Sequence, residues 1–171
     1  ETILDLGCGG GIDTILAAQR AGPTGRVIAL DFLPEMLDRA ALAVKEASPH
    51  TKVAGVEVEA SCPFTRGLEA GRIVEIDVLP TLADGLAGNL DPDTITFDIV
   101  RREVARIAVV NEDQLREAIA GVMQNERLVV EGAGAVGVAA LLSSRLDVRG
   151  KRVAVVLSGA NIDQGTLSEI V

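Results

Sequence analysis

The order of apolar runs along the chain is the feature that most constrains its fold. Residues 2–7, 25–31 and 51–58 read as mostly apolar strands, and amphipathic stretches over 11–22 and 33–49 separate them as helices. Strands that alternate with helices in this way form parallel sheets through right-handed crossover connections. The first third of the sequence therefore predicts an α/β fold.

The rest of the chain continues this alternation less regularly. The sequence predicts strands over 72–79, 106–110 and 152–158, and helices over 61–71, 96–104, 111–126, 133–146 and 164–171. Asn111 is a residue type that caps helix N-termini, and acidic residues follow it in the first turn. Because 171 residues suit one compact domain, we expect a single Rossmann-like three-layer α/β/α domain with a mostly parallel sheet.

The composition argues against several kinds of partner. A net charge of −9 repels the phosphate backbone of nucleic acids. No apolar run reaches the roughly 18 residues that a membrane span needs, and no targeting segment is recognised, so we expect a cytoplasmic protein. The two cysteines, Cys8 and Cys62, are too few for a disulfide framework or a zinc site and are interpreted as reduced thiols.

A glycine-rich turn follows the first predicted strand. In "DLGCGGG", Gly7, Gly9 and Gly11 let the backbone turn tightly and bring its N–H groups and a helix N-terminus close to a ligand. Asp31 follows at the end of the second strand, where a carboxylate accepts hydrogen bonds from the ribose hydroxyls of a nucleoside. The pattern predicts a nucleoside site, and the alternative is a tight turn that serves packing only.

Other residues that could carry chemistry are better explained by local structure. His50, the only histidine, lacks recognisable partners for a triad or a metal site. Cys8 is interpreted as a small apolar filler of the glycine turn. A loose cluster of oxygen donors lacks the spacing of a calcium loop and fits turn roles; it consists of Asp84, Asn89, Asp91 and Asp93. We therefore assign no catalytic residue and no metal ligand.

Residues 1 to about 40 resemble the opening of class I S-adenosylmethionine-dependent methyltransferases, especially those acting on arsenite, quinones or sterols. The resemblance is carried by the segment "ILDLGCGGGIDTILAAQRAGPTGRVIALDFLPEML". The resemblance implies that Asp5, Gly7, Gly9 and Gly11 line the methionine and ribose side of the cofactor. It also implies that Asp31 binds the ribose hydroxyls. The later motifs of that family do not follow in this sequence.

Residues from about 41 to 171 resemble a different family, the pyridoxal-phosphate-dependent serine/threonine dehydratases of fold type II. The segments that carry the resemblance occur in family order: "ALAVKEASPHTKVAGVE", "GLEAGR", "TLADGLAG", "TFDIVRREV", "ERLVVEGAGAVGVAALL" and "GKRVAVVLSGANID". The resemblance implies that Ser158 donates a hydrogen bond to the pyridine nitrogen of the cofactor, while Gly159 and Asn161 shape the turn. It also implies that Glu131 lies near this site.

Essential parts of a dehydratase have no counterpart in the sequence. No segment corresponds to the Schiff-base lysine or to the N-terminal lobe that encloses the substrate. The position of the phosphate loop is taken by residues 29–37, "ALDFLPEML", in which Pro34 has no N–H and Phe32 and Leu33 are bulky. We therefore do not expect pyridoxal phosphate to bind, and we expect no cofactor to be required.

The two resemblances meet inside one predicted helix, near residues 34–47, with the apolar stripe in phase across the join. Natural fusions usually join whole domains through linkers, so this join favours an engineered chimera without evolved catalytic activity. Weak binding of S-adenosylmethionine or another nucleoside is the expected remaining activity. The alternatives are an active methyltransferase and a threonine dehydratase fragment. The edge left open by the absent lobe predicts self-association, with a homodimer as the expected state.

Overall fold

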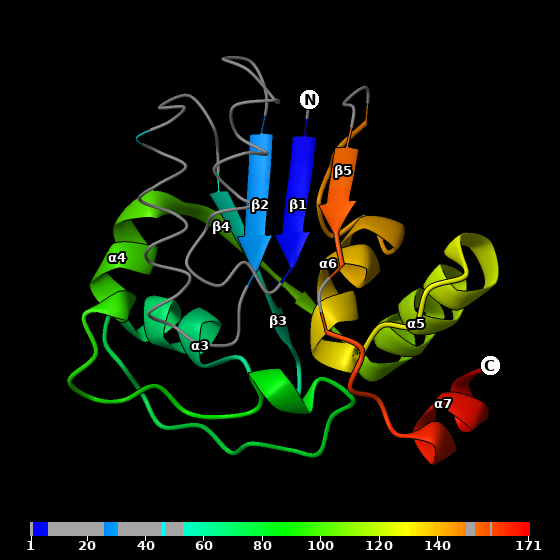
Figure 1. The fold of residues 1–171 in the computed structure, drawn as a ribbon. Coiled ribbons are helices and arrows are strands. Elements are labelled where there is room, and N and C mark those ends of the chain that lie inside the picture. The colour runs from blue at the N-terminus through cyan, green and yellow to red at the C-terminus, as the bar shows by residue number, and fades with distance from the viewer. Residues whose placement is uncertain (1, 7–25, 31–45, 47–52, 150–152, 158) are drawn as a thin grey trace.

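A computed structural model of the chain describes residues 2–6, 26–30, 46, 53–149, 153–157 and 159–171. Strands form the central layer of this part of the chain (Figure 1). They are β1 (Thr2–Leu6), β2 (Arg26–Leu30), β3 (Val53–Val58), β4 (Val104–Val110) and β5 (Val153–Val156). The strands predicted over 2–7, 25–31, 51–58, 106–110 and 152–158 are thereby confirmed, with somewhat different bounds.

All pairs of these strands run parallel, as the alternation of strands and helices predicts. One sheet has the order β2-β1-β5, so the first strand lies between the second and the last. Within it, Thr2 is in register with both Arg26 and Val153. The other sheet pairs β3 with β4, and β3 also lies in contact with β2. The central layer therefore joins segments from both ends of the chain.

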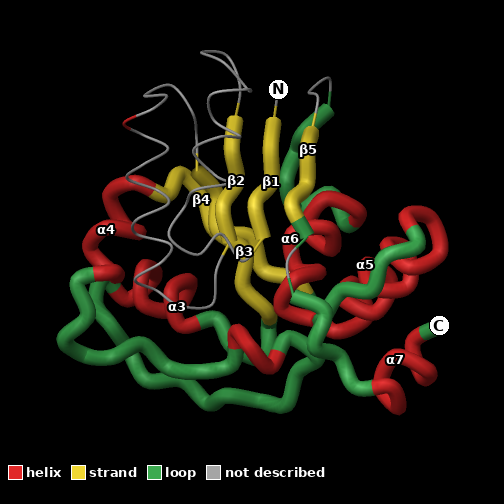
Figure 2. The backbone as a smooth tube through the Cα atoms, viewed as in Figure 1, coloured by secondary structure: helices red, strands yellow, loops and turns green. Residues whose placement is uncertain are grey.

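Helices cover both faces of the strands (Figures 1 and 2), which gives the expected three-layer α/β/α fold. On one side lie α3 (Pro63–Ala70) and α4 (Thr96–Glu103), and on the other lie α5 (Glu112–Glu126) and α6 (Gly132–Leu142). A short 3₁₀ turn, η1 (Asp84–Leu86), and the C-terminal helix α7 (Gln164–Ile170) complete the described elements. No described helix is long and apolar enough to cross a membrane.

The strands separate two apolar cores. The larger core lies between the strands and helices α5 and α6, and its fully buried side chains include Val58, Val110, Leu115, Ile119 and Val136. The smaller core lies beside α3 and α4 and contains Phe64, Leu90, Phe97 and Val100. Because successive side chains of a strand point to opposite faces, Ala108 of β4 joins the larger core while Ile107 packs against the smaller one.

The beginning of α5 confirms the predicted N-cap. The Asn111 side chain accepts a hydrogen bond from Gln114 N at 2.9 Å, and the Gln114 side chain accepts one from Asn111 N at 3.0 Å. This reciprocal pair satisfies backbone N–H groups that the first turn leaves unpaired. The helix that contains the predicted join, residues 34–47, lies outside the described residues except for Glu46, which is helical.

The strand predicted over residues 72–79 is wrong. This segment is an irregular connection, and Val78 and Leu79 are largely exposed. Its alternating apolar residues favour a strand, but a strand also needs a neighbour that pairs with its backbone. Here the backbone of Ile76 is bonded instead by the Asn89 side chain, which accepts from Ile76 N at 2.8 Å and donates to Ile76 O at 3.0 Å. The side-chain amide of Asn89 therefore forms the backbone hydrogen bonds of Ile76 that a neighbouring strand would form in a sheet.

Candidate functional site

The residues predicted to bind ligands lie near the carboxyl ends of three neighbouring strands or shortly after them in the sequence. Asp5 lies in β1, in register with Ala29 of β2 and Val156 of β5. Because the three strands are parallel, their carboxyl ends lie at one edge of the sheet, where α/β proteins usually bind ligands. Gly7, Gly9, Gly11, Asp31 and Ser158, together with Cys8 and His50, lie outside the described residues.

The turn that follows β5 is bonded to Glu131, the residue that precedes α6. Glu131 N donates to Gly159 O at 3.1 Å, and Glu131 Oε2 accepts a hydrogen bond from Asn161 N at 3.0 Å. Gly159 has φ +80°, and a Cβ atom at this position would lie 2.5 Å from the Glu131 carboxylate. The turn therefore requires glycine at 159, both for its backbone conformation and for the space that Glu131 occupies.

The beginning of α6 is in turn packed against the loop that contains Thr81, Leu82 and Ala83. A Cβ atom on Gly132 would lie 1.9 Å from Leu82 O, so the loop backbone passes directly over the helix. Ala83 is fully buried at this crossing. The sequence segments "TLADGLAG" and "VEGAGA" are therefore brought together by a backbone contact that only glycine permits.

Glu112, in the first turn of α5, holds this loop in place. Leu82 N donates to Glu112 Oε2 at 2.9 Å, and the Thr81 hydroxyl donates to Glu112 Oε1. Thr81 Oγ1 also accepts from Ala83 N at 3.1 Å. Sequence reasoning assigned the acids of this turn only to the helix dipole and missed this role, because the partners are about thirty residues away in the chain.

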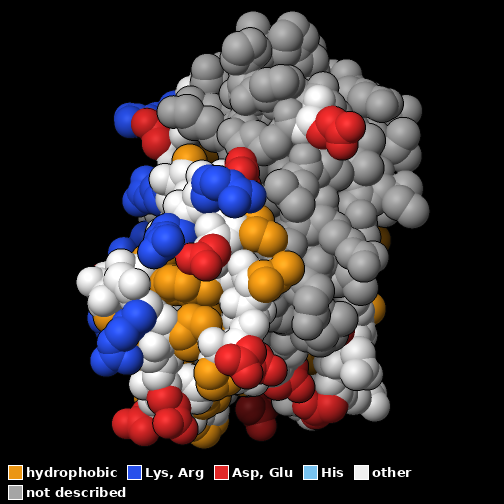
Figure 3. All heavy atoms as spheres, turned by 90° about the vertical axis from the view of Figure 1, so that its left-hand side faces the viewer, with side chains coloured by type: hydrophobic (Ala, Val, Ile, Leu, Met, Phe, Trp, Pro, Cys, Tyr) orange, Lys and Arg blue, Asp and Glu red, His pale blue; other side chains and the backbone are white. Residues whose placement is uncertain are grey.

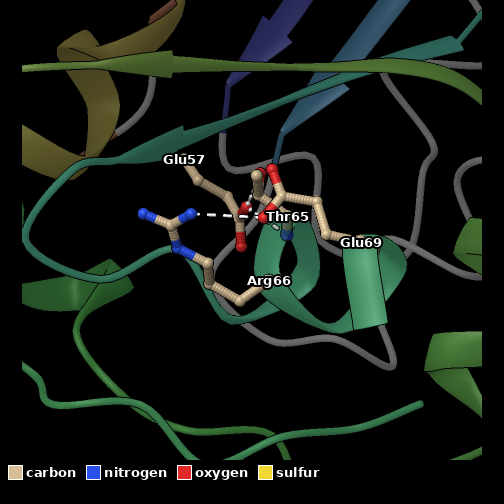
Figure 4. A network of polar contacts seen from close by, with 4 residues as sticks. All are labelled: Glu57, Thr65, Arg66 and Glu69. Carbon is tan, nitrogen blue, oxygen red and sulfur yellow. Dashed lines mark hydrogen bonds and ion pairs between the residues drawn. The ribbon is translucent and has the colours of Figure 1, made fainter. Parts of the chain in front are cut away.

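A second carboxylate missed by sequence reasoning is Glu57 of β3, which caps α3 (Figure 4). Its two oxygens accept hydrogen bonds from Phe64 N at 2.8 Å, Thr65 N at 2.8 Å and Thr65 Oγ1 at 2.6 Å. The residue is 9 % exposed, and burial raises the pKa of its carboxyl group against the opposing effect of these hydrogen bonds. Nearby, Arg66 and Glu69 form an exposed ion pair at 3.2 Å.

Cys62 lies next to this carboxylate and is a free, buried thiol, as expected from the cysteine count. Burial raises the pKa of the Cys62 thiol, and the negative charge of Glu57 raises it further. A thiol with a raised pKa holds little of the reactive thiolate form near neutral pH. Cys62 directly precedes α3 and is 6 % exposed, so its side chain contributes to packing at the start of this helix.

Two members of the predicted cluster of oxygen donors, Asp84 and Asp91, bond the backbone of their own turns, whereas Asn89 bonds that of Ile76. Asp84 Oδ1 accepts from Gly85 N at 2.8 Å, and Asp91 Oδ1 accepts from Asp93 N at 3.0 Å. Within the described residues, no three His, Cys, Asp or Glu side chains gather in an arrangement that could hold a metal ion. These contacts agree with the turn roles predicted for the cluster.

Two family models match overlapping parts of the chain. The model of the "Pyridoxal-phosphate dependent enzyme" family matches residues 40–159, and that of the "Methyltransferase domain" matches residues 3–70. The first covers most of the chain. The chain belongs to the pyridoxal-phosphate dependent enzyme family. The first two strands, β1 and β2, lie in the methyltransferase-like segment. The two matches overlap over residues 40–70, so the methyltransferase match extends past the predicted join near residue 40.

Curated relatives of this pyridoxal-phosphate family member agree with the assignment. The chain is 40 % identical over 136 residues to the L-threonine ammonia-lyase of Thermotoga maritima, covering 80 % of the chain and 33 % of that protein. It is 43 % identical over 132 residues to the L-threonine ammonia-lyase of Geobacter sulfurreducens, covering 77 % of the chain and 32 % of that protein. The chain thus spans about a third of the length of these relatives.

Solved structures show the same fold. A T.th. threonine deaminase superposes with a TM-score of 0.75 at 37 % identity, over 90 % of this chain and 55 % of that one. Maize serine racemase superposes with a TM-score of 0.80 at 24 % identity, over 94 % of this chain and 50 % of that one. At this lower identity, the likeness to the racemase shows the fold alone.

Among the described residues, the turn at Gly159–Asn161 is the part that the dehydratase resemblance assigns to the ring of pyridoxal phosphate. The turn at Gly159–Asn161 is held in a defined conformation beside Glu131, which suits contact with the ring. The phosphate requires several N–H donors, and the corresponding segment 29–37 offers Pro34, which has none. The three lysines, Lys45, Lys52 and Lys151, lie outside the described residues. The described residues therefore include the turn beside Glu131, whereas the segment at the position of the phosphate loop lies outside them from residue 31 onward.

Proposed function

We propose that the 171-residue chain is an engineered hybrid of two α/β families, which binds a nucleoside ligand weakly and catalyses no reaction by itself. The observation that carries the proposal is the position of β1. It belongs to the methyltransferase-like segment, and it pairs with β2 of that segment on one side and with the dehydratase-like β5 on the other. One sheet edge therefore combines the strand ends of two different cofactor sites.

The physical reason for expecting no catalysis is that each cofactor site is incomplete. The methyltransferase-like part carries the glycine turn and Asp31, but not the later motifs of that family. The dehydratase-like part carries the Glu131 turn, but not a phosphate loop. Enzymes accelerate reactions by holding all reacting groups in one geometry, so two partial sites do not add up to one active site.

Parallel calorimetric titrations with S-adenosylmethionine and pyridoxal phosphate test the proposal. We expect weak binding of S-adenosylmethionine, with a Kd on the order of 0.1 mM or above, and no saturable binding of pyridoxal phosphate. Asp31→Ala is expected to weaken binding of S-adenosylmethionine at least about tenfold, because the ribose loses a charged acceptor. The matched control, Asp38→Ala, removes another acid of the same segment and is expected to bind as the unsubstituted chain does.

The second candidate function is that of a pyridoxal-phosphate-dependent threonine dehydratase fragment. The bonding of Glu131 to the turn after β5 favours it, as do the relatives named L-threonine ammonia-lyase. Under this alternative, the titration shows saturable binding of pyridoxal phosphate that Ser158→Ala abolishes. Release of 2-oxobutyrate from threonine by the loaded chain would contradict the absence of catalysis that we propose.

We also propose that the chain forms a homodimer. Apolar side chains lie among charged ones on the side of the molecule that carries α3 and α4 (Figure 3), and Ile95 is 72 % exposed. Exposed apolar surface of this kind favours association.

Light scattering coupled to size-exclusion chromatography is expected to give the mass of two chains, and Ile95→Asp is expected to shift this mass to that of one chain. Leu142→Asp, at an exposed position on α6, is the control, and a monomer at high concentration for the unsubstituted chain contradicts the proposal.

A further inference from the structure

A continuous set of contacts runs from the first turn of α5 to the turn that follows β5. From it we infer that Glu112 is a positioning residue, which holds the backbone of Gly159–Asn161 in place without touching it. The inference rests on the proposed function in one respect, the ligand that the turn would contact. In the second candidate function, this ligand is the ring of pyridoxal phosphate. The coupling itself follows from contacts between described residues.

The first step is the attachment of the loop to α5. Glu112 accepts hydrogen bonds from Leu82 N and from the Thr81 hydroxyl, while Thr81 Oγ1 accepts from Ala83 N. Two consecutive loop residues are therefore bonded to one carboxylate, and the third is bonded to it indirectly through the Thr81 hydroxyl. The carboxylate is held in turn, because the reciprocal bonds of Asn111 and Gln114 define where the helix begins.

The second step is the contact between the loop and α6. Leu82 O lies 1.9 Å from the position that a Cβ atom on Gly132 would take, so the loop and the helix are in direct backbone contact. Ala83 is fully buried there and Gly132 is buried too. Close-packed backbone atoms transmit a displacement because no free space absorbs it. A shift of the loop therefore moves the first residue of α6.

The third step is the hold of Glu131 on the turn. Glu131 directly precedes Gly132, and it bonds the turn twice, through its N–H to Gly159 O and through its carboxylate to Asn161 N. Gly159, Ala160 and Asn161 are themselves exposed, while Leu157 and Ile162 on either side of them pack against the larger core. The geometry of the turn depends on Glu131, and through Gly132 and the loop it depends on Glu112.

Residue-resolved amide hydrogen exchange of the ligand-free chain, followed by NMR, tests this coupling. In Glu112→Ala, exchange at Asn161 is expected to accelerate at least about tenfold, because its acceptor is no longer held in place. In Glu112→Gln, the amide still accepts from Leu82 N and donates to Thr81, so exchange at Asn161 is expected to stay within about threefold of the unsubstituted rate. This rescue distinguishes a positioning role from a general loss of stability.

Two controls make the result specific. Asp113→Ala removes the neighbouring exposed acid of the same helical turn and is expected to leave Asn161 unchanged. The amide of Arg66, bonded to Cys62 O in α3, reports changes in global stability and is expected to be unaffected by Glu112→Ala. If Glu112→Ala fails to fold, Thr81→Val removes one of the two bonds to the carboxylate and is expected to give a smaller acceleration at Asn161.

If Glu112→Ala accelerates amide exchange at Leu82 and Ala83 without any change at Asn161, the inference is overturned. It is also overturned if the amide of Asn161 exchanges as rapidly in Glu112→Gln as in Glu112→Ala. Since no ligand is added, these outcomes do not depend on whether the turn binds one. A failure of the proposed function appears only in the titrations, and a failure of the coupling appears only in the exchange rates.

Discussion

Gly132→Ala is expected to lower the free energy of unfolding by about 3 kcal/mol or more. The added methyl group would lie 1.9 Å from Leu82 O and 2.8 Å from Ala83 N, well inside van der Waals contact. Both neighbours are backbone atoms of the loop, and the hydrogen bond from Leu82 N to Glu112 keeps the loop from moving away from the added methyl group. Chemical denaturation followed by circular dichroism measures the change.

The matched control for this substitution is Gly88→Ala. Gly88 has a negative φ, and a methyl group added there would have no atom within 4 Å other than those of its chain neighbours. The free energy of unfolding of this variant is therefore expected to stay within about 0.5 kcal/mol of the unsubstituted value. If Gly132→Ala were as stable as Gly88→Ala, the close crossing of the loop over α6 would be wrong.

Glu57→Ala is expected to destabilise the chain by about 3 kcal/mol. The substitution leaves the N–H groups of Phe64 and Thr65 without an acceptor, and the first of these is buried. Equilibrium unfolding near neutral pH measures the loss. Glu59→Ala, at an exposed position two residues further along, is expected to change the stability by less than about 0.5 kcal/mol. Equal effects of the two substitutions would contradict the capping role of Glu57.

The same carboxylate predicts a pH dependence with a definite sign. Because burial raises the pKa of Glu57 in the folded chain, protonation of its carboxyl group adds to stability below the ordinary pKa of 4.5, and this pH-dependent part is lost as the pH rises through the folded-state value. The capping contacts that Glu57→Ala removes are a separate contribution, present near neutral pH. Glu57→Gln does not titrate and lacks this decline. The stability of the unsubstituted chain relative to Glu57→Gln is therefore expected to be greater near pH 4 than near pH 7. A difference that grows with pH would show that the three hydrogen bonds outweigh burial.

Most elements of the fold could be predicted because their signals are local. The helix over 111–126 is marked by Asn111 at its start and by helical periodicity, and both survive in the structure. The strands around Val58 and Val110 are apolar runs that a buried sheet requires. Residues 72–79 have the same kind of pattern, but Asn89, more than ten residues away, occupies the backbone of Ile76, and no local signal reveals this.

The candidate site was less predictable, since its essential contacts are long-range. The resemblance to dehydratases indicated that Gly159 and Asn161 shape a turn, and the structure gives that turn a partner in Glu131. Glu57 and Glu112 carried only weak signals, an acid within an apolar strand and an acid in a first helical turn. Their hydrogen-bond partners lie on other elements of the structure, so the contacts exist only in the folded chain.

The position of β1 between β2 and β5 has a consequence for the synthesis of this protein. Because β5 lies far downstream of β1 in the chain, β1 acquires this second neighbour only after residues 153–156 have been synthesised. Until then one backbone edge of β1 has no partner strand, and such edges invite pairing with other chains. A product that stops short of β5 would therefore expose this edge of β1 to pairing with other chains.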